Sequence, residues 1–471
     1  MVKATLRSAV LLGIAAAAVL AAGMPGFAEV QNVKVGGDIT VRAFHRENLD
    51  LADDSGALDK HDNFLMSTTG VNVAADLTEN VSTFVRLANE RDWNLDGAAT
   101  GDFDLSQAYI TLKELFYSPL TLRVGTQPIV WGRGFVLGSN LIPSVLTGGG
   151  DRNGSITANE FTDFTAFDAI RATLDLSSFT GSMPLTADYV YIKLNDNTTG
   201  VSNDVNLQGI NLGTKLDAAH TELEAYYLNK LDDSQATRPA GSAGQNGSVN
   251  TLGVRGSSMP VDGLSTWGEL AYQWGTRATD SAAGDLTSAT TGDRIQAWAT
   301  DWGLEYTLKD VSMTPKVGAE WIFWSGHDAD GAIAGWDPIA RGYFTTAIRE
   351  FQTAIAGGFY GTAQAGDTSA ATNQSQISFW GGLKPVQDLS ATSRLNFFWQ
   401  SVGAIPTRAG IRTSGERKGY AGAEWDNQLV YDYTDDVQLG FLWGIFFPGS
   451  IYHTGAENTA QELVTTVSVK F

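Results

Sequence analysis

The chain of 471 residues contains no cysteine and comparatively few charged residues, which make up 18% of the sequence. Without cysteine, a disulfide-stapled scaffold and a thiolate-ligated metal centre are both excluded. Lysine and arginine number 31 against 52 aspartates and glutamates, which argues against a nucleic-acid-binding protein, because phosphate binding needs surplus positive charge. Hydrophobic residues (43%) and aromatic residues (10%) are nevertheless too frequent for a disordered chain.

Long hydrophobic runs are also missing, apart from one near the N-terminus. Lys3 and Arg7 precede an apolar stretch over 9–23, and Gly26 and Ala28 supply the small residues of a cleavage site. The stretch is shorter than the ~20 residues that a transmembrane helix needs. We therefore predict a signal peptide over 1–28, cleaved after Ala28, and export of the mature chain.

Alternation with a period of two residues dominates the rest of the sequence and predicts β-strands. Trp302, Leu304 and Tyr306, for example, alternate with Asp301 and Glu305. About 18 strands (16–18) are expected. They begin near Val33, Asn63, Val81, Leu105, Leu120, Ala166, Leu185, Val205, Thr221, Val249, Leu264, Ile295, Ser312, Gln376, Leu389, Tyr420, Val437 and Gln461.

The connections between these strands alternate between short and long, and the longest fall near 133–164 and 326–375. This pattern is typical of a transmembrane antiparallel β-barrel with short periplasmic turns and long extracellular loops. Only a closed ring of strands satisfies its backbone groups in lipid. We therefore predict an all-β protein with one outer-membrane barrel domain over 29–471, in a bacterium of the Gram-negative type.

Aromatic residues support the membrane interpretation. The last strand alternates and ends at Phe471, which resembles the terminal signal read by the barrel-insertion machinery. Aromatic side chains also suit the two membrane interfaces. Those expected at extracellular strand ends are Trp131, Trp274, Trp324, Trp399, Trp443 and Phe447, with ordinary core packing as the alternative.

Three stretches of the chain resemble the alginate export family of outer-membrane porins. They are 84–93, which carries an Arg and a rim Trp, 122–134, which leads from an Arg-x-Gly strand into a Gly-rich loop, and 419–436, which is followed by a Phe-Phe-Pro-Gly end. The resemblance follows the barrel order from about residue 30 to 471. It implies an 18-stranded barrel and passive export or uptake of hydrophilic solutes, and alginate itself implies a strongly cationic lumen.

Charged residues at strand centres are expected to face the lumen, because a charge on the lipid face costs roughly 2–4 kcal/mol near the midplane. Basic residues there either guide anions, since a guanidinium stays ionised, or pair with acids and stiffen the wall. The solute is then a small anion, a neutral sugar or another hydrophilic molecule. The candidate pore-lining residues are Arg42, Arg86, Arg123, Arg171, Arg255, Arg394, Lys113, Lys215, Lys316, Glu90, Glu305 and Glu320.

The loop over 326–375 is too long for a simple connection. Phe344, Ile348, Phe351 and Ile355 follow a helical spacing within it. We predict a short helix that caps the pore or folds into it and gates conductance, with an external flap as the alternative.

The other long loop matches part of a calcium-binding pattern. Asp151, Asn153 and Glu160 stand at ligand positions, although Gly149 occupies the place of the first acidic ligand. We consider either a calcium ion held by these three residues or a plain polar turn. No other cofactor is expected.

A catalytic function is not predicted, because the five histidines are scattered, with no HxxxH pair and no Gly-x-Ser-x-Gly elbow. We predict a porin for passive diffusion of hydrophilic solutes, with a bias toward anions, rather than an enzyme. Its expected partners are outer-membrane lipid, lipopolysaccharide, the insertion machinery and the solute. The alternative is a barrel that sheathes a partner, such as an electron-transfer cytochrome or a polymer-export complex.

Overall fold

The computed structural model describes residues 32–49, 51, 61–93, 103–117, 119–139, 156–181, 183–195, 204–233, 246–276, 294–326, 333–351, 372–401, 419–452 and 457–471. The predicted signal peptide over 1–28 lies outside these residues. Among the described residues, no helix is long and apolar enough to cross a membrane.

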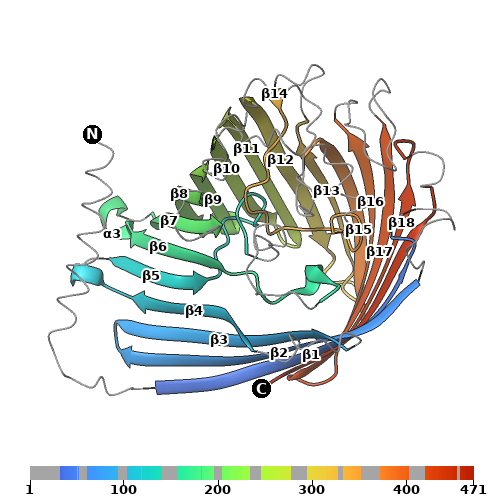
Figure 1. The fold of residues 1–471 in the computed structure, drawn as a ribbon, viewed down its shortest axis with the longest axis horizontal. Coiled ribbons are helices and arrows are strands. Elements are labelled where there is room, and N and C mark those ends of the chain that lie inside the picture. Colours follow the sequence, from blue (N-terminus) through green and yellow to red (C-terminus); the bar gives the residue numbers. More distant parts are fainter. Residues whose placement is uncertain are drawn as a thin grey trace, which may run out of the picture.

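Long β-strands make up most of the described chain (Figure 1). The first ten are β1 (Asn32–Glu47), β2 (His61–Thr78), β3 (Val81–Asp92), β4 (Asp104–Leu112), β5 (Leu120–Gln127), β6 (Phe167–Asp175), β7 (Leu185–Asn195), β8 (Val205–Leu216), β9 (Thr221–Asp232) and β10 (Gly247–Val261). The others are β11 (Leu264–Thr276), β12 (Arg294–Thr307), β13 (Lys316–Trp324), β14 (Ile333–Ala334), β15 (Gln374–Val386), β16 (Leu389–Gln400), β17 (Tyr420–Asp432), β18 (Val437–Pro448) and β19 (Ala460–Lys470). The short helical turns are η1 (Leu115–Tyr117), η2 (Asn159–Phe161), α3 (Ser177–Thr180) and η3 (Ala218–His220).

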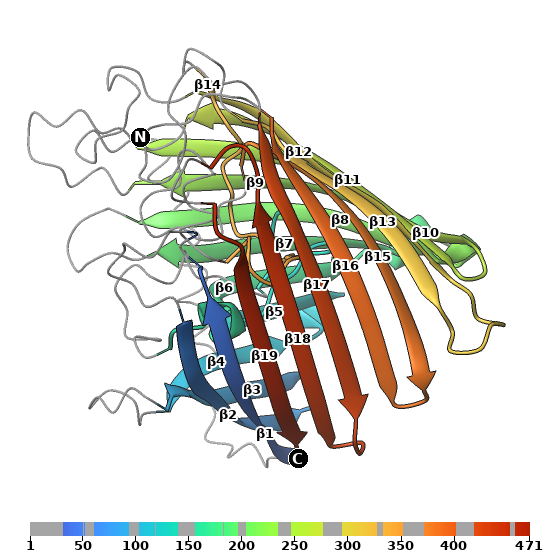
Figure 2. The ribbon, with the colours of Figure 1, turned by 90° about the vertical axis from the view of Figure 1, so that its right-hand side faces the viewer.

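The strands close into one antiparallel barrel, whose curved wall is visible in Figures 1 and 2. Each strand pairs with the next, β13 pairs with β15, and β19 returns to β1 with Ile39 opposite Val469. The two-residue β14 stands apart from this ring and pairs in parallel with β12. The ring therefore has 18 strands, which confirms the predicted barrel and its strand number.

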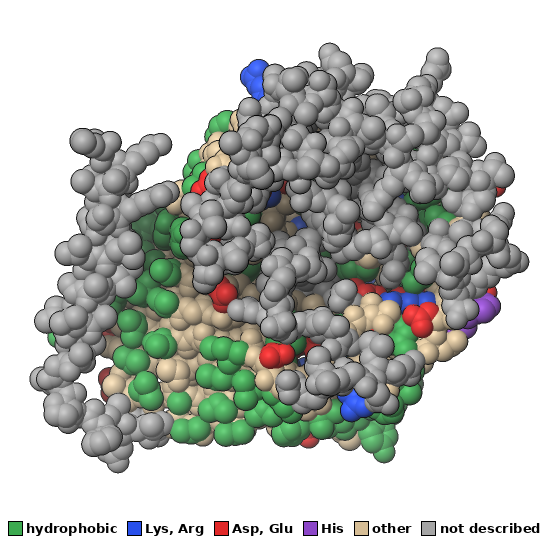
Figure 3. Space-filling model, in the orientation of Figure 1, with side chains coloured by type: hydrophobic (Ala, Val, Ile, Leu, Met, Phe, Trp, Pro, Cys, Tyr) green, Lys and Arg blue, Asp and Glu red, His purple; other side chains and the backbone are tan. Residues whose placement is uncertain are grey.

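The alternation explains why each strand fits a membrane barrel. On β12, Trp302, Leu304 and Tyr306 are exposed on the outer face, whereas Asp301 is fully buried on the inner face. The outer side chains thus meet lipid while the pairing between neighbouring strands satisfies the backbone. Figure 3 shows the consequence on one side of the molecule, where hydrophobic side chains are numerous and charged ones sparse.

Short turns join the strands at one end of the barrel. The first residues of β1 and the last residues of β19 lie at this end. Gly263 sits in the turn between β10 and β11 with a φ of 81°, and a Cβ at this position would lie 2.4 Å from the Thr307 carbonyl oxygen. Glycine is needed there because it alone adopts this left-handed conformation without steric cost.

Most strands begin within a few residues of the predicted positions, and β13 shows the largest difference. It begins at Lys316 instead of Ser312. Met313 and Thr314 have φ values of 67° and 44°, and the Leu308 N–H donates to the Pro315 carbonyl at 2.8 Å. A longer turn than the expected one therefore occupies the start of the predicted strand.

Three segments between strands pack inside the barrel: the first inner segment (129–139), the second (156–166) and the third (333–351) (Figure 1). The first and third are joined by hydrogen bonds from Gly138 N–H to the Ala340 carbonyl at 2.7 Å and from Gly342 N–H to the Gly134 carbonyl at 2.8 Å. Buried apolar clusters attach them to the wall on several sides. Part of the lumen is thus filled by the chain itself.

The third inner segment corrects one prediction. Its described part forms turns over 347–351 and no helix, although Ile348 is fully buried as its apolar spacing suggested. The side chain of Glu424 accepts the backbone N–H groups of 347–349, so these donors are satisfied without a helical partner. Ile355 lies outside the described residues.

Two of the predicted interface aromatics also lie elsewhere. Trp131 and Trp324 are 4% and 1% exposed and belong to the largest buried cluster inside the barrel, so core packing explains them. Trp274 and Phe447, in contrast, are 37% and 45% exposed. Trp131 belongs to the first inner segment itself, and Trp324 faces inward on β13, where Phe135 of that segment stacks on its ring.

Candidate functional site

Four arginines stand on the part of the wall formed by β1, β3, β5 and β6, and two of them are ion-paired. Arg86 donates to Asp38 at 2.7 Å and, from its Nε, to Asp163 of the second inner segment at 2.8 Å. Arg171 pairs with Asp188 at 2.8 Å. These two arginines therefore hold strands and an inner segment together and carry little net charge into the lumen.

The other two arginines of this wall have different surroundings. Arg123 lies opposite Arg171, donates to the Thr111 hydroxyl at 3.2 Å and stacks over Tyr109. Arg42 stacks over Phe161 at 4.8 Å from the ring centre. Within the described part of the chain, no carboxylate approaches either guanidinium within 4.0 Å. Glu90, Asp163, Glu160 and Asp38 nevertheless interact electrostatically with Arg42, so Arg123 is the arginine whose charge is more available to a solute.

A denser polar cluster lies where the first and third inner segments meet the wall. Arg133 donates to Glu320 at 3.2 Å and also contacts the Tyr343 hydroxyl. Tyr343 donates to the same Glu320 oxygen at 2.8 Å, and Arg394 pairs with the second oxygen. Burial raises the pKa of Tyr343 well above its ordinary range, so its hydroxyl stays protonated and keeps donating.

Two tryptophans extend this cluster along the wall. The rings of Trp267 and Trp380 are stacked, with centroids 6.2 Å apart. Arg133 lies 4.0 Å from the Trp267 ring centre and Arg394 lies 4.5 Å from that of Trp380. A Cβ on Gly318 would lie 2.1 Å from the Trp380 ring, so the small neighbour makes room for it. Flat rings flanked by guanidinium groups offer both apolar and cationic contacts to a passing molecule.

Glu424 anchors the third inner segment to β17. Its carboxylate accepts N–H bonds from Ala347 at 2.8 Å, Ile348 at 2.7 Å and Arg349 at 2.9 Å. The Arg349 guanidinium in turn donates to Gln374 at 3.0 Å. A fully buried charged anchor of this kind fixes the segment in one position across the lumen.

The comparisons with known proteins agree with this architecture. The family model described as "Alginate export" matches residues 32–466. The chain belongs to the alginate export family. No curated protein sequence matches the chain.

Solved structures that resemble this alginate export protein are outer-membrane porins. OccAB2 of Acinetobacter baumannii has a TM-score of 0.53 at 12% identity, covering 94% of this chain and 98% of its own. OpdO of Pseudomonas aeruginosa has a TM-score of 0.52 at 12% identity, with 94% and 98% covered. A BenF-like porin from Pseudomonas fluorescens Pf-5 has a TM-score of 0.51 at 11% identity, with 95% and 100% covered. At such identities the likeness concerns the fold.

Family and fold together place this alginate export protein among outer-membrane channels. Membership of a family of export channels also agrees with the prediction that the chain is not an enzyme.

The remaining predicted pore-lining residues occupy several levels of the barrel. Glu90 is buried and accepts the Thr162 hydroxyl at 2.9 Å, and Arg255 pairs with Glu224 at 2.6 Å. Glu305 accepts the Trp380 indole N–H at 2.7 Å. Three lysines lie towards the end with the short turns: Lys113 in the turn after β4, Lys215 near the end of β8 beside Glu222, and Lys316 at the start of β13 beside Glu305.

The predicted calcium ligands are only partly described. Asp151 and Asn153 lie outside the described residues. Glu160 lies inside the barrel in the second inner segment, where its carboxylate pairs with Arg46, and Arg46 also donates to Glu462 at 2.6 Å. The calcium site therefore stays a prediction.

Several residues of the lumen cluster were missing from the predicted set. Arg133, Tyr343 and Arg349 belong to inner segments, and alternation says nothing about side chains outside strands. Trp267 and Trp380 stand on inward positions of β11 and β15, so the alternation itself was the signal that could have placed them in the lumen.

Proposed function

We propose that this outer-membrane channel lets small hydrophilic solutes diffuse through its lumen and favours anions. The observation that carries the proposal is Arg123, which stands on the inward face of β5 against Thr111 and Tyr109 with no carboxylate within 4.0 Å among the described residues. Unpaired arginines attract anions and repel cations, and arginine rings are a common selectivity device of anion pores.

Small solutes fit the lumen better than a long polymer. The inner segments bury Phe135 and Ile348 almost completely against the wall, so they narrow the cross-section. A polyuronate would also need a continuous cationic lining, whereas Arg133 and Arg394 are both ion-paired with Glu320. We therefore infer that small anions and other hydrophilic molecules pass, and that the third inner segment limits conductance.

The inner segments also favour a channel over a sheath, because the chain itself occupies space that a partner protein would need. We further propose that 1–28 is a signal peptide cleaved after Ala28 and that the barrel-insertion machinery reads the Phe471 end. Lipid and lipopolysaccharide then surround the barrel.

The test compares an unpaired with a paired arginine. Arg123→Gln removes a net positive charge, whereas the double substitution Arg171→Gln with Asp188→Asn removes a neutral ion pair. An anion passing about 6 Å from a guanidinium in water gains about 0.7 kcal/mol and a cation loses about as much, a difference of about 1.4 kcal/mol or about tenfold. We therefore expect Arg123→Gln to lower the chloride-to-potassium permeability ratio by up to about tenfold and the double variant to leave it close to wild type.

Reversal potentials in planar bilayers under a KCl gradient measure this ratio. An unchanged permeability ratio in Arg123→Gln would show that this arginine only supports the barrel wall. A wild-type pore that favours potassium would overturn the anion preference.

A further inference from the structure

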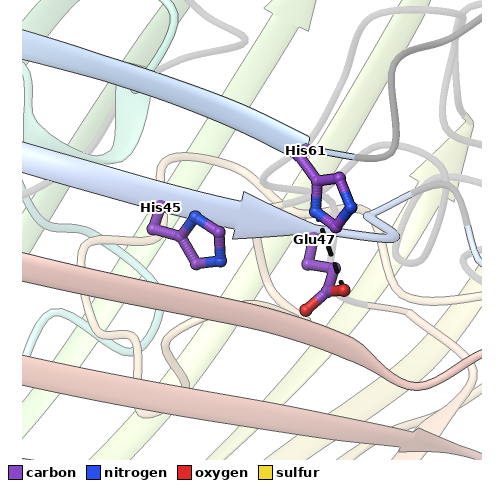
Figure 4. A group of neighbouring side chains, drawn as sticks. All are labelled: His45, Glu47 and His61. Carbon is purple, nitrogen blue, oxygen red and sulfur yellow. Dashed lines mark ion pairs between the residues drawn. The ribbon is translucent and has the colours of Figure 1, made fainter.

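Two of the five histidines face each other at the end of the barrel opposite the short turns. His45 and Glu47 end β1, and His61 begins β2 (Figure 4). In the register of these strands, Glu47 lies opposite His61 and His45 lies opposite Asn63. Side chains on directly opposite and diagonal positions of one face are close enough to act together.

The three side chains form a compact set of metal-binding atoms. One nitrogen or oxygen from each of His45, Glu47 and His61 lies within 4.8 Å of the others, and His61 Nδ1 is 3.7 Å from Glu47 Oε1. Zinc binds histidine nitrogen and carboxylate oxygen at about 2.0–2.2 Å, which places tetrahedral ligand atoms roughly 3.3 Å apart. Side-chain rotations alone can close the remaining gap. Within the residues that the structure describes, no other group of three histidines and acids meets this geometry.

Each of two candidate ligands is oriented by a neighbouring amide. His45 Nδ1 lies 2.7 Å from the Asn63 Oδ1 oxygen, which can only accept, so Nδ1 carries the proton and Nε2 keeps its lone pair for a metal. Gln461 donates to Glu47 Oε2 at 3.4 Å, which leaves Oε1 turned to His61. Such outer partners are the usual support of metal-binding histidines and carboxylates.

The position in the wall makes the cluster accessible to ions in water. Val35 and Ile39 are exposed on the same outer face of β1, at 71% and 43%, and form part of the apolar band. His45 and Glu47 follow beyond this band at the strand end, and the His61 side chain is 58% exposed. The cluster therefore lies at the level of lipid headgroups, outside the hydrocarbon and outside the pore.

We propose that His45, Glu47 and His61 bind a divalent transition-metal ion of the Zn²⁺, Cu²⁺ and Ni²⁺ class at this outer rim. Imidazole nitrogen suits these ions, whereas Ca²⁺ and Mg²⁺ prefer oxygen ligands, so this site is distinct from a calcium loop or from cations bridging lipid headgroups. The bound ion links the last residues of β1 to the first of β2 and clips the two strands at their outer ends. A water molecule completes the coordination.

Metal titration of the refolded full-length protein in detergent, after treatment with a chelator, tests the proposal. We expect one Zn²⁺ per chain, and at least tenfold weaker binding in His45→Gln and in His61→Gln. Asn63→Ala should weaken binding about tenfold through the lost orientation of His45. His220→Gln is the matched control, because His220 lies in η3 at the end with the short turns.

Circular dichroism of each variant shows whether the barrel has formed. Equal affinity of wild type and His61→Gln would overturn the proposal, and so would a loss of the same size in His220→Gln. Electron paramagnetic resonance of bound Cu²⁺ in the wild type gives a measurement without substitutions. Two coordinated imidazole nitrogens are expected, and none or only one contradicts the assigned site.

Discussion

Replacing Glu424 by alanine should release the third inner segment from the wall. The Glu424 carboxylate is fully buried and accepts three backbone N–H bonds, from Ala347, Ile348 and Arg349. In the variant these donors lose their partner inside the barrel. The segment then exchanges its docked position for one in which water satisfies the N–H groups.

The size of the effect follows from the three bonds. Hydrogen bonds to a charged group contribute about 1.5 kcal/mol each at the low end, so their loss costs about 4–5 kcal/mol. Water that reaches the freed N–H groups offsets part of this loss. A net change of about 3 kcal/mol raises the undocked population about 100-fold.

Single-channel recording in planar bilayers measures this population. The variant should show frequent transitions to a higher conductance that are rare in the wild type. Asp432→Ala is the control, because Asp432 stands on the same strand but is exposed near the short turns. Identical dwell times in wild type and Glu424→Ala, with a folded barrel in both, would refute the idea that Glu424 holds a conductance-limiting segment.

Two further substitutions probe the lumen cluster. Tyr343→Phe removes the hydroxyl bonded to Glu320, and should lower the free energy of unfolding by about 1–3 kcal/mol in urea titrations at neutral pH. Burial raises the pKa of Tyr343, so the stabilising effect of its hydroxyl is complete below the unfolded pKa of about 10 and is lost as the pH rises above that value. The difference in stability between wild type and variant should therefore shrink at high pH. A difference that stays constant would contradict this. Gly318→Leu places side-chain atoms on the Trp380 ring and should destabilise the barrel by about 1–3 kcal/mol, and an unchanged urea midpoint would show that the ring moves freely.

The strand pattern was predictable because each strand lies between two different environments. Lipid selects apolar residues such as Leu304 on one face, and the polar lumen selects residues such as Glu305 on the other, so the alternation survives in every strand. Turn conformation, in contrast, depends on single residues. Met313 and Thr314 adopt left-handed conformations, but methionine and threonine are not residue types that indicate such a turn.

The inner segments could not be predicted to the same depth. The wall surrounds the third inner segment, so Ile348 packs against it whatever the backbone conformation, and the helical spacing of Phe344 and Ile348 did not produce a helix. Contacts such as Arg133 with Glu320 join residues 187 positions apart. Alternation tells which side a wall residue faces, but not which loop enters the barrel to meet it.

The current through the refolded protein in a planar bilayer under a KCl gradient tests the central claim most directly. If the protein is an outer-membrane channel with unpaired arginines in its lumen, we expect discrete conducting steps and a reversal potential set mainly by chloride. The absence of conducting steps from protein that is folded and inserted would contradict the account.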